Sequence, residues 1–117
     1  MIPATTVRRV CLVHDRVDFR KGHDGLMGES YRRGLRPYEG DLVIFVGRHL
    51  RSLKLLVFDG SGLCVLYKKL QGRSLRKQFR FLSDGSTSTL SFAEVALLLE
   101  GARYTIHEPT RDPEANL

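Results

Sequence analysis

Residues 41–70 read DLVIFVGRHLRSLKLLVFDGSGLCVLYKKL, and this stretch decides the fold. Three runs in it are rich in Val, Ile, Leu, Phe and Tyr, the residue types that favour β-strands. The runs cover 41–46, 52–59 and 63–70, and the linkers between them, GRHLR and GSG, are short enough for hairpins. We therefore predict an antiparallel β-meander over residues 41–70. The continuous apolar character of its first strand indicates that this strand is covered on both faces.

An apolar run and a helical pattern precede the meander. The run at 10–13 predicts a short buried strand, and the apolar spacing over 19–33 predicts a helix. Asp18 is suited to cap that helix, because its carboxylate can accept a hydrogen bond from a free N–H of the first turn. Gly34 is suited to end it.

The stretch RVDFRKGHDGL (16–26) at the start of this helix combines charged residues with two glycines and admits two interpretations. One is a catalytic pocket. The other is a helix start in which Gly22 and Gly25 allow close approach to the sheet, while His23 faces the sheet and is at least partly buried. We favour the helix start, because the aspartates nearby have explanations as cap, strand-entry and turn residues.

The C-terminal part of the chain carries a second helix signal. Ser91 and Glu94 have the spacing of a capping box, in which each side chain bonds the backbone N–H of the other residue. Leu90 can pack on Val95 as a hydrophobic staple. Gly101 is the expected C-cap of this helix.

These patterns together predict one α+β domain over residues 1–106. The segment FRFL (79–82) is a candidate further strand, and the tail over 107–117, with two prolines and no apolar periodicity, is expected to be disordered. The predicted elements are a central antiparallel meander (about 41–70), an N-terminal strand, and two packed helices (about 19–33 and 92–100).

The composition fits a soluble globular protein of 117 residues, with 42% hydrophobic and 27% charged residues. No apolar run approaches the roughly 18 residues that cross a membrane, and no leader-peptide pattern is visible, so we expect a cytoplasmic protein with no membrane contact. Cys11 and Cys64 stand among apolar residues, which favours buried free thiols over a disulfide. The four histidines are scattered and no Cys-x-x-Cys pair occurs, so neither a metal nor a cofactor is expected.

The net charge of +6 is unevenly distributed along the chain. Residues 1–80 hold 17 Lys and Arg against 7 Asp and Glu, whereas residues 81–117 hold 2 against 6. Such asymmetry is typical of a protein that turns one face to a polyanion, and a solvated face without a partner is the alternative. The candidate nucleic-acid-binding residues are Arg48, Arg51, Lys68, Lys69, Arg73, Arg76, Lys77 and Arg80.

The predicted topology brings part of this charge together. Because the chain reverses twice in a meander, the tip of the first hairpin and the far end of the third strand lie at the same edge of the sheet. The tip carries Arg48, His49 and Arg51, and Lys68, Lys69 and Arg73 leave the end of the third strand. We therefore expect both groups to lie on one basic rim, which would bind phosphates with little sequence preference. Aromatic residues that could stack on bases are sparse there, and we interpret Tyr67 and Phe79 as core residues.

The sequence gives weaker support for catalysis than for nucleic-acid binding. A metal-dependent nuclease of the restriction type needs an acidic residue two positions before a lysine on a central strand, but Ser52 holds that position before Lys54. The sequence has no Gly-x-Ser-x-Gly elbow, no phosphate loop and no complete dinucleotide fingerprint. We therefore expect no catalytic residues.

Four ordered blocks carry a family resemblance: VDFRKGHDGL, LRPYEGDLVIFVGR, LKLLVFDGSGLCVLYKKL and LSFAEVALLLEG. From about residue 10 to residue 101, the chain resembles the TnpB accessory proteins of IS66-type insertion sequences, which are unrelated to the RNA-guided nucleases of the same name. The sequence departs from the family pattern at His23, where isoleucine is usual, and at the GRHLR tip, which replaces a more arginine-rich turn. The positions that match the family motifs are Asp18, Arg20, Lys21, Gly22, Asp24, Gly25, Lys54, Asp59, Gly60, Gly62, Tyr67 and Lys68.

The resemblance implies a role in DNA transposition beside a larger catalytic transposase, with no catalytic residues to transfer. The favoured function is therefore a non-enzymatic accessory factor that binds DNA, the transposase, or both. The alternative is a protein-interaction adaptor without DNA binding of its own, and a metal-dependent nuclease ranks third.

Overall fold

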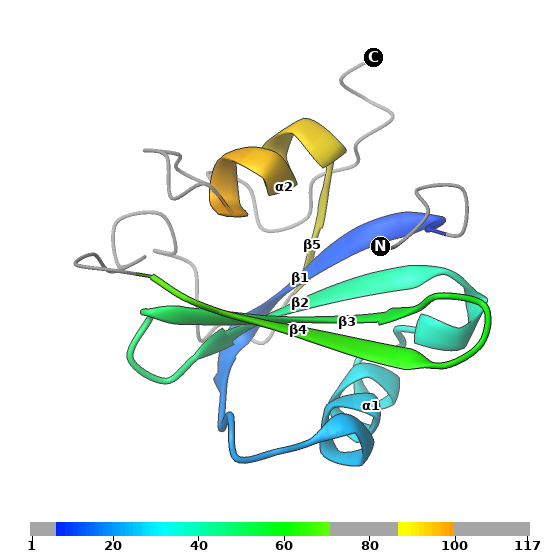
Figure 1. Cartoon of the computed structure of the whole chain (residues 1–117), viewed down its shortest axis with the longest axis horizontal. Coiled ribbons are helices and arrows are strands. Elements are labelled where there is room, and N and C mark those ends of the chain that lie inside the picture. Colours follow the sequence, from blue (N-terminus) through cyan, green and yellow to red (C-terminus); the bar gives the residue numbers. More distant parts are fainter. Residues whose placement is uncertain (1–6, 71–86, 100–117) are drawn as a thin grey trace.

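Residues 41–70 form the three-stranded meander that the sequence predicts (Figure 1). The computed structural model describes residues 7–70 and 87–99. β2 (Asp41–Gly47) pairs antiparallel with β3 (Ser52–Phe58), which pairs antiparallel with β4 (Leu63–Lys69). The prediction of the meander is confirmed.

Two further strands extend the meander into a mixed sheet with the order β4-β3-β2-β1-β5. β1 (Arg9–Val17) runs parallel to β2, with Val10 opposite Leu42, and β5 (Thr87–Leu90) pairs antiparallel with the other edge of β1. The parallel pairing follows from the helix that lies between β1 and β2 in the chain, because a parallel connection needs such a crossover. The α+β class is confirmed, whereas the sequence did not predict the parallel pairing or β5.

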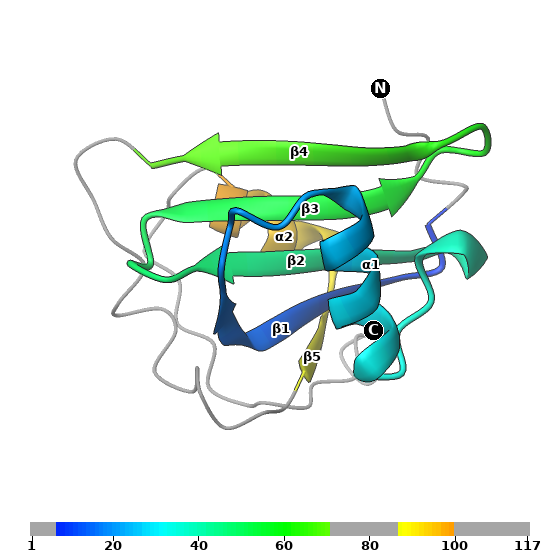
Figure 2. The same cartoon turned by 90° about the horizontal axis from the view of Figure 1, so that it is seen from below.

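The two helices cover opposite faces of the sheet (Figures 1 and 2). The face covered by α1 (His23–Arg32) carries one apolar cluster, which includes Leu26 and Phe45. A second cluster on the face covered by α2 (Phe92–Leu99) includes Ile44 and Val95. Successive β2 residues alternate between these clusters, and every residue of β2 is buried, as the sequence predicts.

The start of α1 differs from the prediction. The helix begins at His23, four residues later than expected, and its N-cap, Gly22, has no side-chain cap. Asp18 instead accepts hydrogen bonds from the backbone N–H of Arg20 at 3.0 Å and from the guanidinium of that residue at 2.6 Å. The prediction of Asp18 as the cap is wrong, because this local turn satisfies the carboxylate before the helix begins. The predicted C-terminal residue is confirmed, since Gly34 has a φ of 75° directly after the helix.

The explanation for the helix glycines is also wrong. A Cβ built on Gly22 would have no heavy atom within 4 Å, and one built on Gly25 would lie nearest to the side chain of Lys21, not to the sheet. His23 is exposed and does not face the sheet. Because α1 begins late, the contacts with the sheet fall to Leu26 and Met27, both of which are buried.

The capping box of α2 is confirmed. The backbone N–H of Glu94 donates to Ser91 Oγ at 3.1 Å, and the backbone N–H of Ser91 donates to Glu94 Oε1 at 3.0 Å. Leu90 and Val95 are buried in the same apolar cluster, as a hydrophobic staple requires. The predicted strand at 79–82, the cap at Gly101 and the tail over 107–117 lie outside the described residues.

Both cysteines are free, as expected. Cys11 is buried beside β2 and β5, and burial raises the pKa of its thiol to about 11. Cys64 is only partly buried, and its thiol lies 3.5 Å from Asp59 Oδ2.

Candidate nucleic-acid interface

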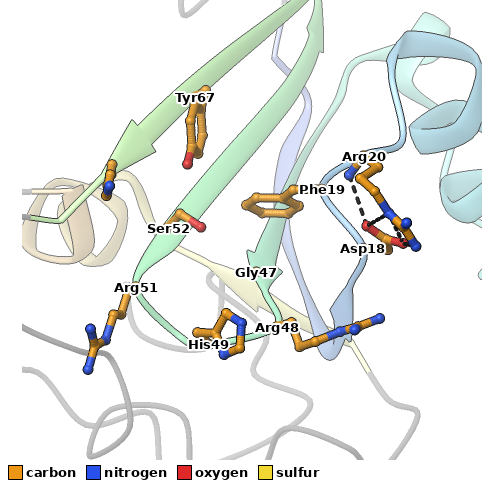
Figure 3. A pocket seen from close by; sticks show the side chains of 10 residues that line it. Asp18, Phe19, Arg20, Gly47, Arg48, His49, Arg51, Ser52 and Tyr67 are labelled. Atoms are coloured by element: carbon orange, nitrogen blue, oxygen red, sulfur yellow. Dashed lines mark hydrogen bonds and ion pairs between the residues drawn. The ribbon is translucent and has the colours of Figure 1, made fainter.

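The tip of the β2–β3 hairpin and the end of β4 meet at one edge of the sheet. Ser52 pairs with Lys69 in the β3–β4 register, and the backbone N–H of Leu70 donates to the carbonyl of Arg51 at 2.8 Å. Leu50 in the turn has a φ of 57° and is only 1% exposed, so the turn is anchored in the core by its one apolar side chain. The polar side chains of the turn therefore project outward (Figure 3).

A pocket of about 780 Å³ opens at this edge (Figure 3). In the described part of the chain, its walls come from three segments: 18–20 before α1, the end of β2 with the turn to β3, and the end of β4. The residues that line it are Asp18, Phe19, Arg20, Gly47, Arg48, His49, Arg51, Ser52, Tyr67 and Lys69.

The charge of the pocket is strongly positive. We define the basic rim as the four cationic residues of the described lining, Arg20, Arg48, Arg51 and Lys69. Asp18 is the single carboxylate among the described lining residues, which together have a net charge of +3. Hydrogen bonds from Arg20, with a smaller contribution from the charge of Arg48, hold the pKa of Asp18 well below its usual range. Among residues 7–70 and 87–99, no carboxylate forms an ion pair with the other three rim cations. Their charge is available to a ligand.

Arg8 and Arg9, near the opposite end of β2, form ion pairs with a carboxylate, unlike the three rim cations that have no such partner among the described residues. The buried carboxylate of Asp41 accepts two hydrogen bonds from the Arg9 guanidinium, at 2.8 and 3.0 Å, one from Arg8 at 3.1 Å, and one from the backbone N–H of Arg36 at 2.7 Å. Burial alone would raise the pKa of Asp41, but these hydrogen bonds outweigh burial and lower it. Arg8 and Arg9 therefore stabilise a buried charge.

Two aromatic rings form the inner wall of the pocket. The rings of Phe19 and Tyr67 are perpendicular, with centroids 6.1 Å apart. Lys54 Nζ lies 5.1 Å from the Phe19 centroid and 5.8 Å from the Tyr67 centroid. Gly47 makes room for this arrangement, since a Cβ there would lie 3.2 Å from the Phe19 ring and 2.6 Å from Ser52 Oγ.

Tyr67 is 55% exposed, so its assignment to the core is wrong. β4 is the last strand of the described sheet, and α1 does not cover its C-terminal end (Figure 2). Phe19, Gly47 and Ser52 were missed as pocket residues. The signal for Gly47 was present, because a glycine in a strand interior often marks a close approach of another group.

The structure brings Arg48, Arg51 and Lys69 of the sequence-predicted site together around the pocket. Lys68 does not join them, because alternate residues of a strand point to opposite faces and Tyr67 and Lys69 occupy the pocket face. The remaining candidates, Arg73, Arg76, Lys77 and Arg80, lie outside the described residues.

Several family-motif residues have structural roles. Asp59 accepts the backbone N–H groups of Ser61 and Gly62, each at 2.9 Å, and these bonds lower its pKa to about 2. Gly60 has a φ of 102°, which the β3–β4 turn requires. Asp24 lies exposed in the first turn of α1.

Residues 7–70 and 87–99 contain no group of three or more His, Cys, Asp and Glu side chains that could hold a metal ion. In the same described part of the chain, no helix has the length and apolarity to cross a membrane.

Comparison with known proteins identifies the family. The model of the IS66 Orf2-like proteins matches residues 8–109. The protein y4hO of Sinorhizobium fredii (strain NBRC 101917 / NGR234) is 30% identical over 115 residues, covering 97% of this chain and 96% of the relative. The protein y4jC of the same organism is 31% identical over 106 residues, covering 90% and 88%. Both relatives are described as uncharacterized, and no solved structure matches the chain.

The family match spans β1 to α2 and therefore covers both the mixed sheet and the segments that build the pocket. The chain belongs to the IS66 Orf2-like family, the accessory proteins of IS66-type insertion sequences.

Proposed function

We propose that this protein is a non-enzymatic accessory factor of DNA transposition, and that it binds DNA through the basic rim. Membership of the IS66 Orf2-like family supports the link to transposition. The observation that carries the DNA-binding part is the concentration of Arg48, Arg51 and Lys69 around one pocket without carboxylate partners among the described residues.

Such a rim acts on the phosphate backbone. Arginine and lysine neutralise phosphates and release condensed counterions, which gives affinity but little sequence preference. The transposase would supply site selection, and the accessory protein would hold DNA beside it. We expect this to take place in the bacterial cytoplasm, where the DNA of an insertion sequence is found.

The test is the salt dependence of duplex binding by the full chain. We expect dissociation constants of about 10⁻⁴ to 10⁻⁶ M at physiological salt. Arg48→Ala, Arg51→Ala and Lys69→Ala should each reduce the log–log salt slope by about 0.9 if the residue neutralises one phosphate. Fluorescence anisotropy at several salt concentrations measures both quantities.

Arg36→Ala is the matched control. Its guanidinium is exposed and, within the described part of the chain, pairs only with the exposed Glu39, at 3.4 Å; the residue lies beyond the opposite end of β2. This variant loses the same charge but should leave the slope unchanged. Equal slopes for the rim variants and the control would contradict a specific role for the rim. Added magnesium should cause no strand cleavage, and cleavage would favour the nuclease hypothesis.

A pure adaptor is the second candidate. β4 is the last strand of the described sheet, and a strand edge is a surface to which another protein can bind by adding a strand. The adaptor hypothesis predicts a stable complex with the transposase and no DNA binding at low salt. Co-purification with the transposase, with and without DNA of the element ends, separates the two functions.

A further inference from the structure

The pocket beside the basic rim contains more than phosphate-binding groups. Its volume of about 780 Å³ lies within the range of about 300 to 1,000 Å³ that is usual for small-ligand sites. Phosphates of duplex DNA can be bound by exposed cations on an open surface and need no cavity. The cavity and its aromatic wall therefore call for a ligand group that is flat and apolar as well as anionic.

Tyr67 provides the surface for such a group. More than half of its side chain is exposed, and the perpendicular contact with Phe19 fixes the orientation of the ring. The ring is thus held in place before any ligand arrives. Nucleobases stack on aromatic side chains of this kind whatever their sequence, because every base has a π-face.

The position of the cations favours single-stranded nucleic acid over a free nucleotide as the ligand of the pocket. A site for a free nucleotide collects the phosphates at one helix N-terminus or one glycine-rich loop. Here Arg20, Arg48 and Lys69 come from three separate segments around the opening. Cations spread along a groove beside an aromatic ring are typical of proteins that bind single-stranded nucleic acid.

We infer that this pocket binds an unpaired nucleotide of single-stranded DNA, with the base stacked on Tyr67 and the neighbouring phosphates held by Arg48, Arg51 and Lys69. The inference rests on the proposed DNA-binding function and specifies which form of DNA the site prefers. A base within a duplex reaches such a pocket only after it leaves the stack, which costs free energy. The protein should therefore prefer DNA that is already unpaired, as at a frayed or cleaved end.

The experiment compares a short single strand with the duplex of the same sequence at one salt concentration. The strand carries 2-aminopurine, whose fluorescence changes when it stacks. We expect tighter binding to the single strand and a fluorescence change on binding. Tyr67→Ala should weaken single-strand binding by about tenfold and abolish the fluorescence change, but leave duplex binding unaltered. Tyr67→Phe keeps the ring and should retain the single-strand affinity, the fluorescence change and the duplex binding.

Tyr38→Ala is the matched control, because Tyr38 is 53% exposed and packs edge-on against Phe58 with centroids 5.2 Å apart, outside the pocket. It should behave as the unaltered protein. Tyr67→Leu retains an apolar contact with Phe19 but has no ring, so it tests stacking if Tyr67→Ala does not fold.

Three results would overturn the inference. Equal affinity for both DNA forms, with no effect of removing the Tyr67 ring, would remove the stacking site and leave the proposed function intact. Competition by a free deoxynucleotide at concentrations similar to those of the strand would assign the pocket to small molecules. Absence of binding to either form of DNA would overturn the proposed function together with the inference.

Discussion

The side-chain ammonium of Lys54 on β3 donates a hydrogen bond to the backbone carbonyl of Phe19 at 2.9 Å and lies 5.1 Å from the centroid of its ring. The same ammonium lies 3.3 Å from the carbonyl of Lys21. A residue in the middle of the sheet thus holds the segment before α1 in place. Lys54 belongs to the family motif, and its contacts give it a positioning role in the pocket wall.

Replacing Lys54 with methionine should therefore lower stability without removing a phosphate contact. We expect a loss of about 1 to 2 kcal/mol in the free energy of unfolding, because hydrogen bonds from a partly exposed charged donor are lost. Urea unfolding measures this. The salt slope of duplex binding should stay unchanged, in contrast to that of Arg51→Ala. A fall of about one unit in the magnitude of the salt slope would instead indicate that Lys54 reaches a phosphate.

Gly47→Ala should distort the pocket. The new Cβ would lie 2.6 Å from Ser52 Oγ and 3.2 Å from the Phe19 ring, so one of the two must move. Overpacking of this kind costs about 1 to 3 kcal/mol, which thermal or urea unfolding would detect. Adding Ser52→Ala removes the Oγ that makes the closer contact and should restore part of the loss. Unchanged stability of Gly47→Ala would contradict the close packing of Phe19 on β2.

Asp41→Asn tests the buried carboxylate at the other end of β2. At pH 7 the variant should be less stable by about 2 to 3 kcal/mol, because charged hydrogen bonds from Arg9 and Arg8 are weakened. The pKa of Asp41 is lowered on folding from its ordinary value of 3.8, so its contribution is present above pH 3.8 and is lost as the pH falls through the folded-state pKa. The difference between the two proteins should therefore shrink in acid.

Denaturant unfolding of both proteins across this pH range provides the measurement. Asp59, whose pKa is lowered to about 2, is present in both and cancels in the comparison. A stability difference that stays constant as the pH falls below 3.8 would show that folding does not lower the pKa of Asp41.

Ser91→Ala should destabilise the protein by about 1 kcal/mol through loss of the α2 cap. The Oγ of Ser91 accepts the Glu94 N–H at 3.1 Å, and alanine leaves that donor without its acceptor. Ser91→Asn is the control, since asparagine is an equally good cap residue. The melting temperatures should fall for alanine and stay close to the original for asparagine.

Local signals in the sequence were sufficient for the meander and for the start of α2. Short linkers limit how the three strands within residues 41–70 can pair. The spacing of Ser91 and Glu94 has one common explanation, a capping box. The start of α1 was misplaced because Asp18 fits two local structures, a cap and a turn closed by Arg20. A residue-type preference alone does not distinguish them.

The pocket was predictable only in part. Turn geometry brought Arg48, Arg51 and Lys69 to one edge, because this required nothing beyond the order of the strands. The contribution of Phe19 depends on where the segment before α1 lies in space, and that position depends on its contact with Lys54. Contacts between segments so far apart produce no periodic pattern in the sequence from which they could be predicted.

The pairing of Val10 with Leu90 joins residues that are eighty positions apart, whereas the β2–β3 and β3–β4 ladders join near neighbours in sequence. Closing a long loop costs more chain entropy and slows the contact that closes it. The meander should therefore assemble early, and β5 with α2 should dock last onto β1. If unfolding follows the reverse order, β5 and α2 should be the first elements to separate from β1. The amide hydrogens of β5 should therefore exchange with solvent well before those of β2.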